Sequence, residues 1–99
     1  MKLWIDDVRP APEGYVRYRT VNNAQYAIEL YESIKLPIDL IDIGCEAGIY
    51  SRDGGNYIRL LSWLEATGRD YPIRIHSQNP VGAANMRAII KRNGWKEIK

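Results

Sequence analysis

The chain has 99 residues, of which 45% are hydrophobic and 26% are charged, and its formal net charge is +2. This length suits a single domain over residues 1–99, and this composition excludes a disordered chain. The apolar stretches are too short to cross a bilayer, and the charge bias is too weak to predict binding to duplex DNA.

The numbers of cysteines and histidines limit the disulfides and metal sites that the chain can form. Cys45 is the only cysteine and His76 is the only histidine, which excludes an internal disulfide, a cysteine-based zinc site and a His-pair metal site. A site made of carboxylates alone would favour a hard cation such as Mg²⁺. The N-terminus reaches Asp6 after only five residues, whereas a secretory signal needs a longer apolar region. We therefore expect a cytoplasmic protein without a membrane partner.

Signals for strands and helices alternate along the chain. Apolar residues two apart are typical of strands, and apolar residues three and four apart are typical of helices. Asn22 or Asn23 can cap the first helix, and Asn79 can cap the last one. In chain order we predict a strand at 2–5, a loop at 9–14, a strand at 15–21, a helix ending before 37, a strand at 38–43, a loop at 44–55, a helix at 56–66, a strand at 72–76, a helix at 81–92 and a short strand at 95–98.

This alternation predicts an α/β fold with a small, mostly parallel sheet and helices on both faces. The connection over residues 6–14 is the exception, because it is too short and too rich in proline to form a crossover helix. We expect Trp4, Trp63 and Trp95 to pack between the sheet and the helices.

Polar residues follow three of the predicted strands. Asp6 and Asp7 end the first strand, Asp42 lies near the end of the third, and His76 and Ser77 end the fourth. In an open α/β sheet, ligands bind beyond the carboxyl ends of the strands. The sequence therefore predicts one site at this edge.

The three aspartates are candidates for positioning a water molecule or a Mg²⁺ ion. Neighbouring carboxylates raise each other's pKa unless a cation offsets their charge. Arg9 is the nearest candidate cation, and its planar fork could equally clamp a phosphate. In the structural alternative, Asp7 pairs with Arg9 and stabilises the loop.

The segment at 76–82 predicts an anion site. Asn79 and Pro80 suit a helix start, which would turn free N–H groups toward the edge of the sheet. Gly82 would let a ligand approach the backbone, and Asn85 follows one turn later. His76 is a candidate acid or base because its ordinary pKa is about 6.5. The structural alternative is a hydrogen-bonded histidine beneath a capped helix.

Three further groups have open roles. Ser77 neighbours His76, so the two side chains point to opposite faces and Ser77 is predicted to donate to a phosphate oxygen instead of acting as a nucleophile. Tyr50 and Tyr57 could stack on a base or simply cover the core. The last group is either a solvated surface or an approach surface for an anion, and it comprises Arg87, Lys91, Arg92, Lys96 and Lys99.

Two segments, LWIDDVRPAPEG at 3–14 and IHSQNPVGAANM at 75–86, resemble the cyclic-phosphate-processing receiver-like domain family. The resemblance spans nearly the whole chain and implies a flavodoxin-like sheet with strand order 2-1-3-4-5. It also implies a role in recognising or processing cyclic phosphates of nucleotides or RNA ends. The residues implied for the site are Asp6, Asp7, Asp42, His76 and Ser77, with Arg9, Asn79 and Asn85 in support.

The third strand departs from the family pattern. Relatives typically read Asp-His-Asp before Leu-Gly, whereas residues 40–44 read Leu-Ile-Asp-Ile-Gly. The missing acid and histidine affect catalysis more than phosphate capture, which backbone N–H groups can achieve.

Three functions therefore stay open. The first is recognition, with hydrolysis, of a cyclic or terminal phosphate on a nucleotide or RNA 3′-end, and the second is sequestration of a cyclic nucleotide without turnover. The third is a phospho-accepting receiver that uses Asp42, Mg²⁺ and Lys99. The sequence does not predict an oligomeric state.

Overall fold

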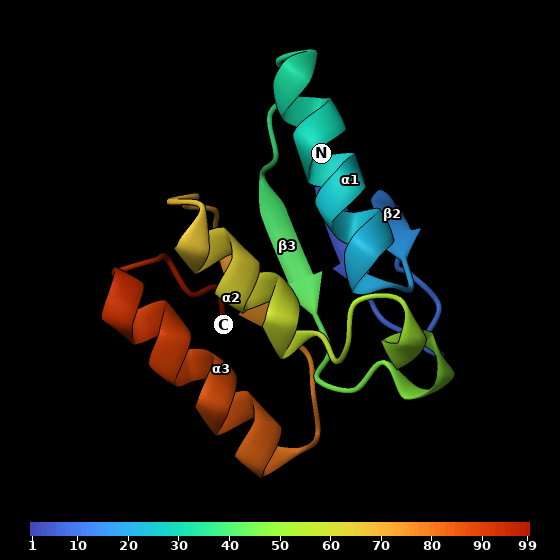
Figure 1. The fold of residues 1–99 in the computed structure, drawn as a ribbon, viewed down its shortest axis with the longest axis vertical. Helices are drawn as coiled ribbons and strands as arrows, with labels where there is room; N and C mark the ends of the chain where they lie inside the picture. Colours follow the sequence, from blue (N-terminus) through green and yellow to red (C-terminus); the bar gives the residue numbers. More distant parts are fainter.

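A computed structural model describes residues 1–99 as a parallel sheet packed against three α-helices (Figure 1). The α/β class and the receiver-like arrangement predicted from the sequence are confirmed. The elements in chain order are β1 (Lys2–Ile5), β2 (Tyr15–Tyr18), α1 (Val21–Ser33), β3 (Leu40–Ile43), the short 3₁₀ helix η1 (Gly48–Arg52), α2 (Ile58–Ala66), β4 (Ile73–Ile75) and α3 (Pro80–Asn93).

The strand order is β2-β1-β3-β4, and every neighbouring pair is parallel. The predicted order is therefore found for the first four strands. The predicted fifth strand is reduced to a single parallel bridge, in which Glu97 pairs with Ile73 beside β4. All four carboxyl ends consequently lie along one edge of the sheet.

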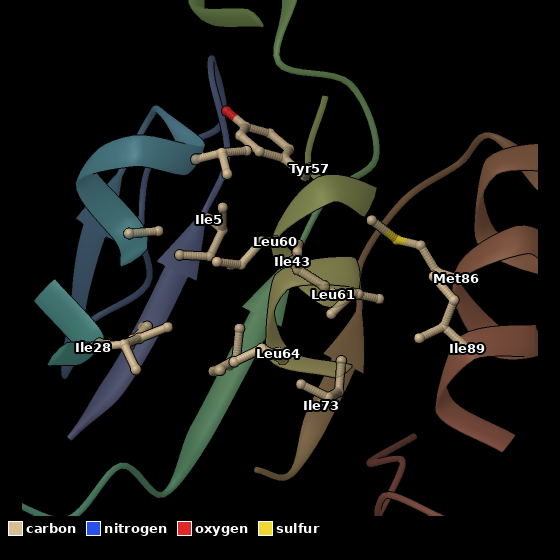
Figure 2. Packing of buried hydrophobic residues seen from close by; sticks show 14 of the residues in the cluster. Ile5, Ile28, Ile43, Tyr57, Leu60, Leu61, Leu64, Ile73, Met86 and Ile89 are labelled. Atoms are coloured by element: carbon tan, nitrogen blue, oxygen red, sulfur yellow. The ribbon is translucent and has the colours of Figure 1, made fainter. Parts of the chain in front are cut away.

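All three helices pack on the same face of the sheet. The fully buried strand residues Leu3, Ile5, Ile41, Ile43 and Ile73 alternate along their strands and therefore share that face. They form one apolar cluster with residues of α1, α2 and α3, and Figure 2 shows the side chains of this cluster lying between the strands and the helices.

This arrangement differs from the expected helices on both faces. A right-handed crossover places its helix on a face set by the direction in which the chain moves across the sheet. The connections β2–β3 and β3–β4 move in one direction, and β1–β2 moves in the other. Because β1–β2 is a loop without a helix, the second face of the sheet stays free of helices.

Local capping sets the helix boundaries. The Asn23 N–H donates to Thr20 Oγ1 at 3.0 Å, so Thr20 caps α1, and the prediction of Asn22 or Asn23 was wrong. Asn79 caps α3 as predicted, because its Oδ1 accepts from the Gly82 N–H at 3.1 Å. None of the helices combines the length and the apolar character needed to cross a membrane.

Candidate functional site

The carboxyl ends of β1, β3 and β4 surround a pocket of about 270 Å³. Its lining includes five of the residues selected from the sequence, together with segments on either side of them. Asp42 and His76 lie beside this lining and connect to it through Asp6. The lining residues are Asp6, Asp7, Val8, Arg9, Gly44, Cys45, Glu46, Ser77, Gln78 and Asn79.

His76 lies between two aspartates. Its Nε2 is 2.7 Å from Asp6 Oδ2, and its Nδ1 is 2.6 Å from Asp42 Oδ1. The side chains of His76, Asp6 and Asp42 are only 10%, 7% and 1% exposed. A Cβ at Gly44 would lie 3.0 Å from Asp6 Oδ2, so the glycine leaves room for this arrangement. Three strands thus contribute to one buried acid–histidine–acid group.

Both ring nitrogens of His76 contact a carboxylate oxygen. A carboxylate only accepts hydrogen bonds, whereas a neutral imidazole donates from one nitrogen alone. Two short bonds at opposite nitrogens therefore require either an imidazolium or a protonated aspartate. Asp6 is the member of the group that reaches the pocket.

Asp6 also fixes the loop after β1. Its Oδ1 accepts from the N–H groups of Val8 and Arg9 at 3.0 and 2.9 Å. Burial raises the pKa of Asp6, but the hydrogen bonds from Arg9, His76 and Val8 and the charge of His76 outweigh burial and hold the pKa below its ordinary value. The carboxylate is thus the favoured form of Asp6.

Aromatic and cationic side chains cover the group on the helix-free face. The Trp4 ring stacks on the His76 ring with centroids 3.8 Å apart, and its Nε1–H donates to the Arg9 carbonyl. The Tyr15 hydroxyl donates to Asp42 Oδ2 at 3.2 Å, and Arg74 Nη1 is 3.9 Å from that oxygen. Both oxygens of Asp42 are therefore occupied by side chains of the chain itself.

Arginines hold the β1–β2 loop against the sheet. Arg9 Nη1 donates to the His76 carbonyl at 2.5 Å, and Arg17 Nη2 donates to the Asp7 carbonyl at 2.9 Å. Neither guanidinium pairs with a carboxylate, so the expected alternative of an Asp7–Arg9 pair does not occur. Arg9 keeps its full charge at the wall of the pocket.

Several backbone N–H groups of the pocket lining donate no hydrogen bond within the chain. They come from the ends of three strands, and each belongs to a residue that lines the pocket. Backbone N–H groups that no acceptor of the chain occupies can donate to a bound anion. The residues are Asp7, Cys45, Glu46, Ser77 and Gln78.

A comparison with models of protein families shows which family the chain belongs to. The family model of the cyclic-phosphate processing receiver domain matches residues 1–92. The chain belongs to this family. Neither the curated proteins nor the solved structures contain a match to the chain.

In this receiver domain the site residues predicted after β4 do not all line the same pocket. Ser77 Oγ accepts from the Asn79 N–H at 3.0 Å, and Asn79 Nδ2 donates to Glu46 Oε1 at 3.0 Å. Gly82 and Asn85 lie outside the main pocket and line a neighbouring one of about 150 Å³. A Cβ at Gly82 would lie 3.1 Å from Cys45, so this glycine permits close packing with that side chain.

The acidic residues do not fit a Mg²⁺ ion. No group of three His, Cys, Asp or Glu side chains has an arrangement that could hold a metal. His76 occupies the space between Asp6 and Asp42, and the Asp7 carboxylate points toward Gly48, at 2.9 Å from the position of a Cβ there.

Tyr57 is fully buried, and its hydroxyl donates to the Arg19 carbonyl, so it belongs to the core instead of stacking on a base. Trp63 and Trp95 pack with the apolar cluster as expected, but Trp4 lies on the helix-free face against His76.

Sequence reasoning did not select Trp4, Tyr15 or Arg17 for the site. The signal was available in the alternation of the strands, since residues 2, 4 and 6 share one face of β1. What was missing was the knowledge that no helix covers this face.

Proposed function

We propose that the pocket binds a nucleotide through a cyclic or terminal phosphate. The observation that carries the proposal is the set of five unbonded backbone N–H groups beside Arg9. All five belong to residues that line one pocket, and they come from three strand ends. Membership in the cyclic-phosphate processing receiver domain family supports a cyclic phosphate as the anion.

The acids of the lining favour a ligand that also carries hydroxyl groups. Asp7 forms no hydrogen bond or ion pair through its carboxylate, and Glu46 accepts only from Asn79. A lone inorganic anion would be repelled by these carboxylates. A ribonucleotide offers phosphate oxygens to the N–H groups and ribose hydroxyl groups to the acids. It therefore fits both the donors and the carboxylates of the pocket lining.

Calorimetric titration tests the binding. A 2′,3′-cyclic mononucleotide should bind the wild-type protein, and Arg9→Gln should weaken binding about tenfold through loss of a charge-assisted bond. Arg52→Gln removes an exposed arginine from η1, outside the pocket lining, and should leave the affinity unchanged. Absence of heat with all four bases, or equal effects of both variants, would refute the proposal.

The Asp6–His76–Asp42 group favours hydrolysis as a second step. The oxygen of an attacking water would form a bond to phosphorus while one ester P–O bond of the ring breaks. Asp6 would take the proton of the water, with His76 and Asp42 stabilising the change in charge, and the leaving oxygen would take a proton from solvent. Because the leaving oxygen takes its proton from solvent in this scheme, we expect turnover to be slow.

Phosphorus NMR separates cleavage from sequestration. In the hydrolytic case the signal of the cyclic ester is replaced by that of a linear monoester, and Asp6→Asn abolishes the change while keeping an oxygen that caps the loop. Quantitative recovery of intact cyclic nucleotide from a tight complex would establish sequestration instead.

The geometry does not favour the phospho-accepting alternative. Asp42 is 1% exposed and its oxygens are bonded to His76 and Tyr15, which blocks attack on a phosphoryl donor. Lys99 pairs with Glu97 at 3.6 Å and is 83% exposed. Incubation with acetyl phosphate should leave the mass of the protein unchanged.

A further inference from the structure

The helix-free face of the sheet carries an unusual set of side chains. Lys2, Tyr15 and Leu40 form one row across three strands, and the next row runs Arg17, Trp4, Asp42 and Arg74. Asp42 is the only acid among these seven, and it is buried. The accessible part of this face is therefore positively charged.

The chain itself does not neutralise these cations. Lys2 has no ion pair, Arg17 donates only to the backbone carbonyls of Asp6 and Asp7, and Arg74 comes no nearer than 3.9 Å to Asp42. Three arginines outside this face form closer pairs with glutamates, at 2.8 to 3.0 Å. Those pairs are Arg69 with Glu32, Arg87 with Glu97 and Arg92 with Glu65.

We propose that this face binds a single-stranded nucleic acid chain whose 3′ end occupies the pocket. Open sheets bind single strands through cations that follow the phosphates and aromatic rings that stack on bases. Tyr15 supplies a partly exposed ring, and Lys2 Nζ lies 5.2 Å from its centroid.

Two arginines of the face lie next to residues of the pocket. Arg74 is two residues before His76, and Arg17 is bonded to the loop that contains Asp6 and Asp7. A strand leaving the pocket would meet these arginines first and Lys2 later. The inference rests on the proposed function and narrows its ligand from a free nucleotide to the end of a single strand. An acidic protein would use the cations but would have no use for the ring.

Fluorescence anisotropy can test this with three probes: a ten-nucleotide single-stranded RNA ending in a 2′,3′-cyclic phosphate, the same RNA ending in hydroxyl groups, and a cyclic mononucleotide as competitor. The cyclic-ended RNA should bind at least tenfold more tightly than the mononucleotide. Lys2→Glu should weaken RNA binding about tenfold and reduce its salt dependence, with no effect on the mononucleotide.

Lys91→Glu is the matched control, since Lys91 is an exposed lysine of α3 on the helical side. Circular dichroism of both variants checks that the fold is retained. Equal affinities for RNA and mononucleotide, or equal effects of the two variants, would overturn the proposal. Displacement of RNA by polyglutamate with the same dependence on Lys2 would also overturn it in favour of an acidic protein partner.

A pocket that does not recognise the cyclic phosphate would give a different result. If the hydroxyl-ended RNA binds as tightly as the cyclic-ended RNA and remains sensitive to Lys2→Glu, the face binds nucleic acid and the proposed phosphate recognition is wrong.

Discussion

The two faces of the sheet are built from the same strands but are stabilised in different ways. On the helical face, Ile5 and Ile43 pack among leucines of α2 with no polar partner (Figure 2). On the other face, Trp4 and Asp42 are also buried, yet no helix covers them. Their cover consists of neighbouring side chains on the same face, chiefly Tyr15 and His76.

The two faces therefore depend on different interactions. Apolar packing depends on volume and tolerates a change of pH, whereas the Asp6–His76–Asp42 group depends on charge and on short hydrogen bonds. The helix-free face therefore stabilises the fold and also places groups that can hold a proton beside the pocket. Four substitutions test whether the two faces respond differently to the loss of one side chain.

The largest loss should come from the helical face. Leu61 is fully buried, and Leu61→Ala should reduce the free energy of unfolding by about 4 kcal/mol through lost burial and a residual cavity. The loss should be the same at pH 5 and pH 8, as measured by urea denaturation. A loss that varies strongly with pH would show that the two faces are not energetically distinct.

His76→Ala should cost about 3 kcal/mol at pH 7, because it leaves two buried carboxylates without the group between them. His76 helps to lower the pKa of Asp6 through its hydrogen bond and its charge, so without it protonation of Asp6 at pH 4 should relieve part of the loss. Gln78→Ala, a pocket residue whose side chain forms no hydrogen bond, is the control and should have little effect. A loss independent of pH would mean that His76 acts only by packing.

Asp6→Asn should cost about 2 kcal/mol at pH 7, as expected for loss of a charged hydrogen-bond partner. The pKa of Asp6 is lowered in the folded protein, so its contribution is complete above the ordinary value of 3.8 and is lost as the pH falls through the folded pKa. The variant should therefore lose stability less steeply than wild type below pH 4. Unchanged steepness would assign the acid sensitivity to the glutamates with lowered pKa values, Glu32, Glu65 and Glu97.

Tyr15→Phe should have the smallest effect, about 1 kcal/mol, because it removes one 3.2 Å hydrogen bond to Asp42 and keeps the ring. Thermal denaturation would detect the shift. Leu40→Ala, on the same face and only partly buried, provides a comparison without a hydrogen bond. No change in Tyr15→Phe would indicate that Arg74 and His76 suffice to hold Asp42.

The sequence predicted the helical face well, because the spacing of Leu60, Leu61 and Leu64 reports a buried helix stripe directly. The cap at Asn79 was equally local and was confirmed. No short motif reports the uncovered face, which follows only when the strand order, the right-handed crossover and the helix-free connection at 6–14 are considered together.

For the site, the convergence of residues after β1, β3 and β4 could be predicted from strand polarity alone. The bond of His76 to both aspartates could not, because side-chain direction at strand ends varies with the local turn. No residue pattern marks a backbone N–H group that lacks an acceptor. The free N–H groups of Cys45 and Gln78 could therefore be found only in the structure.

The most direct test of phosphate recognition is a titration of ¹⁵N-labelled protein with a 2′,3′-cyclic mononucleotide, followed by the amide signals. The largest changes should appear at Asp7, Cys45, Glu46, Ser77 and Gln78, while amides of the apolar cluster stay in place. Saturating ligand that leaves these five signals unmoved, or that shifts amides elsewhere, would contradict the account.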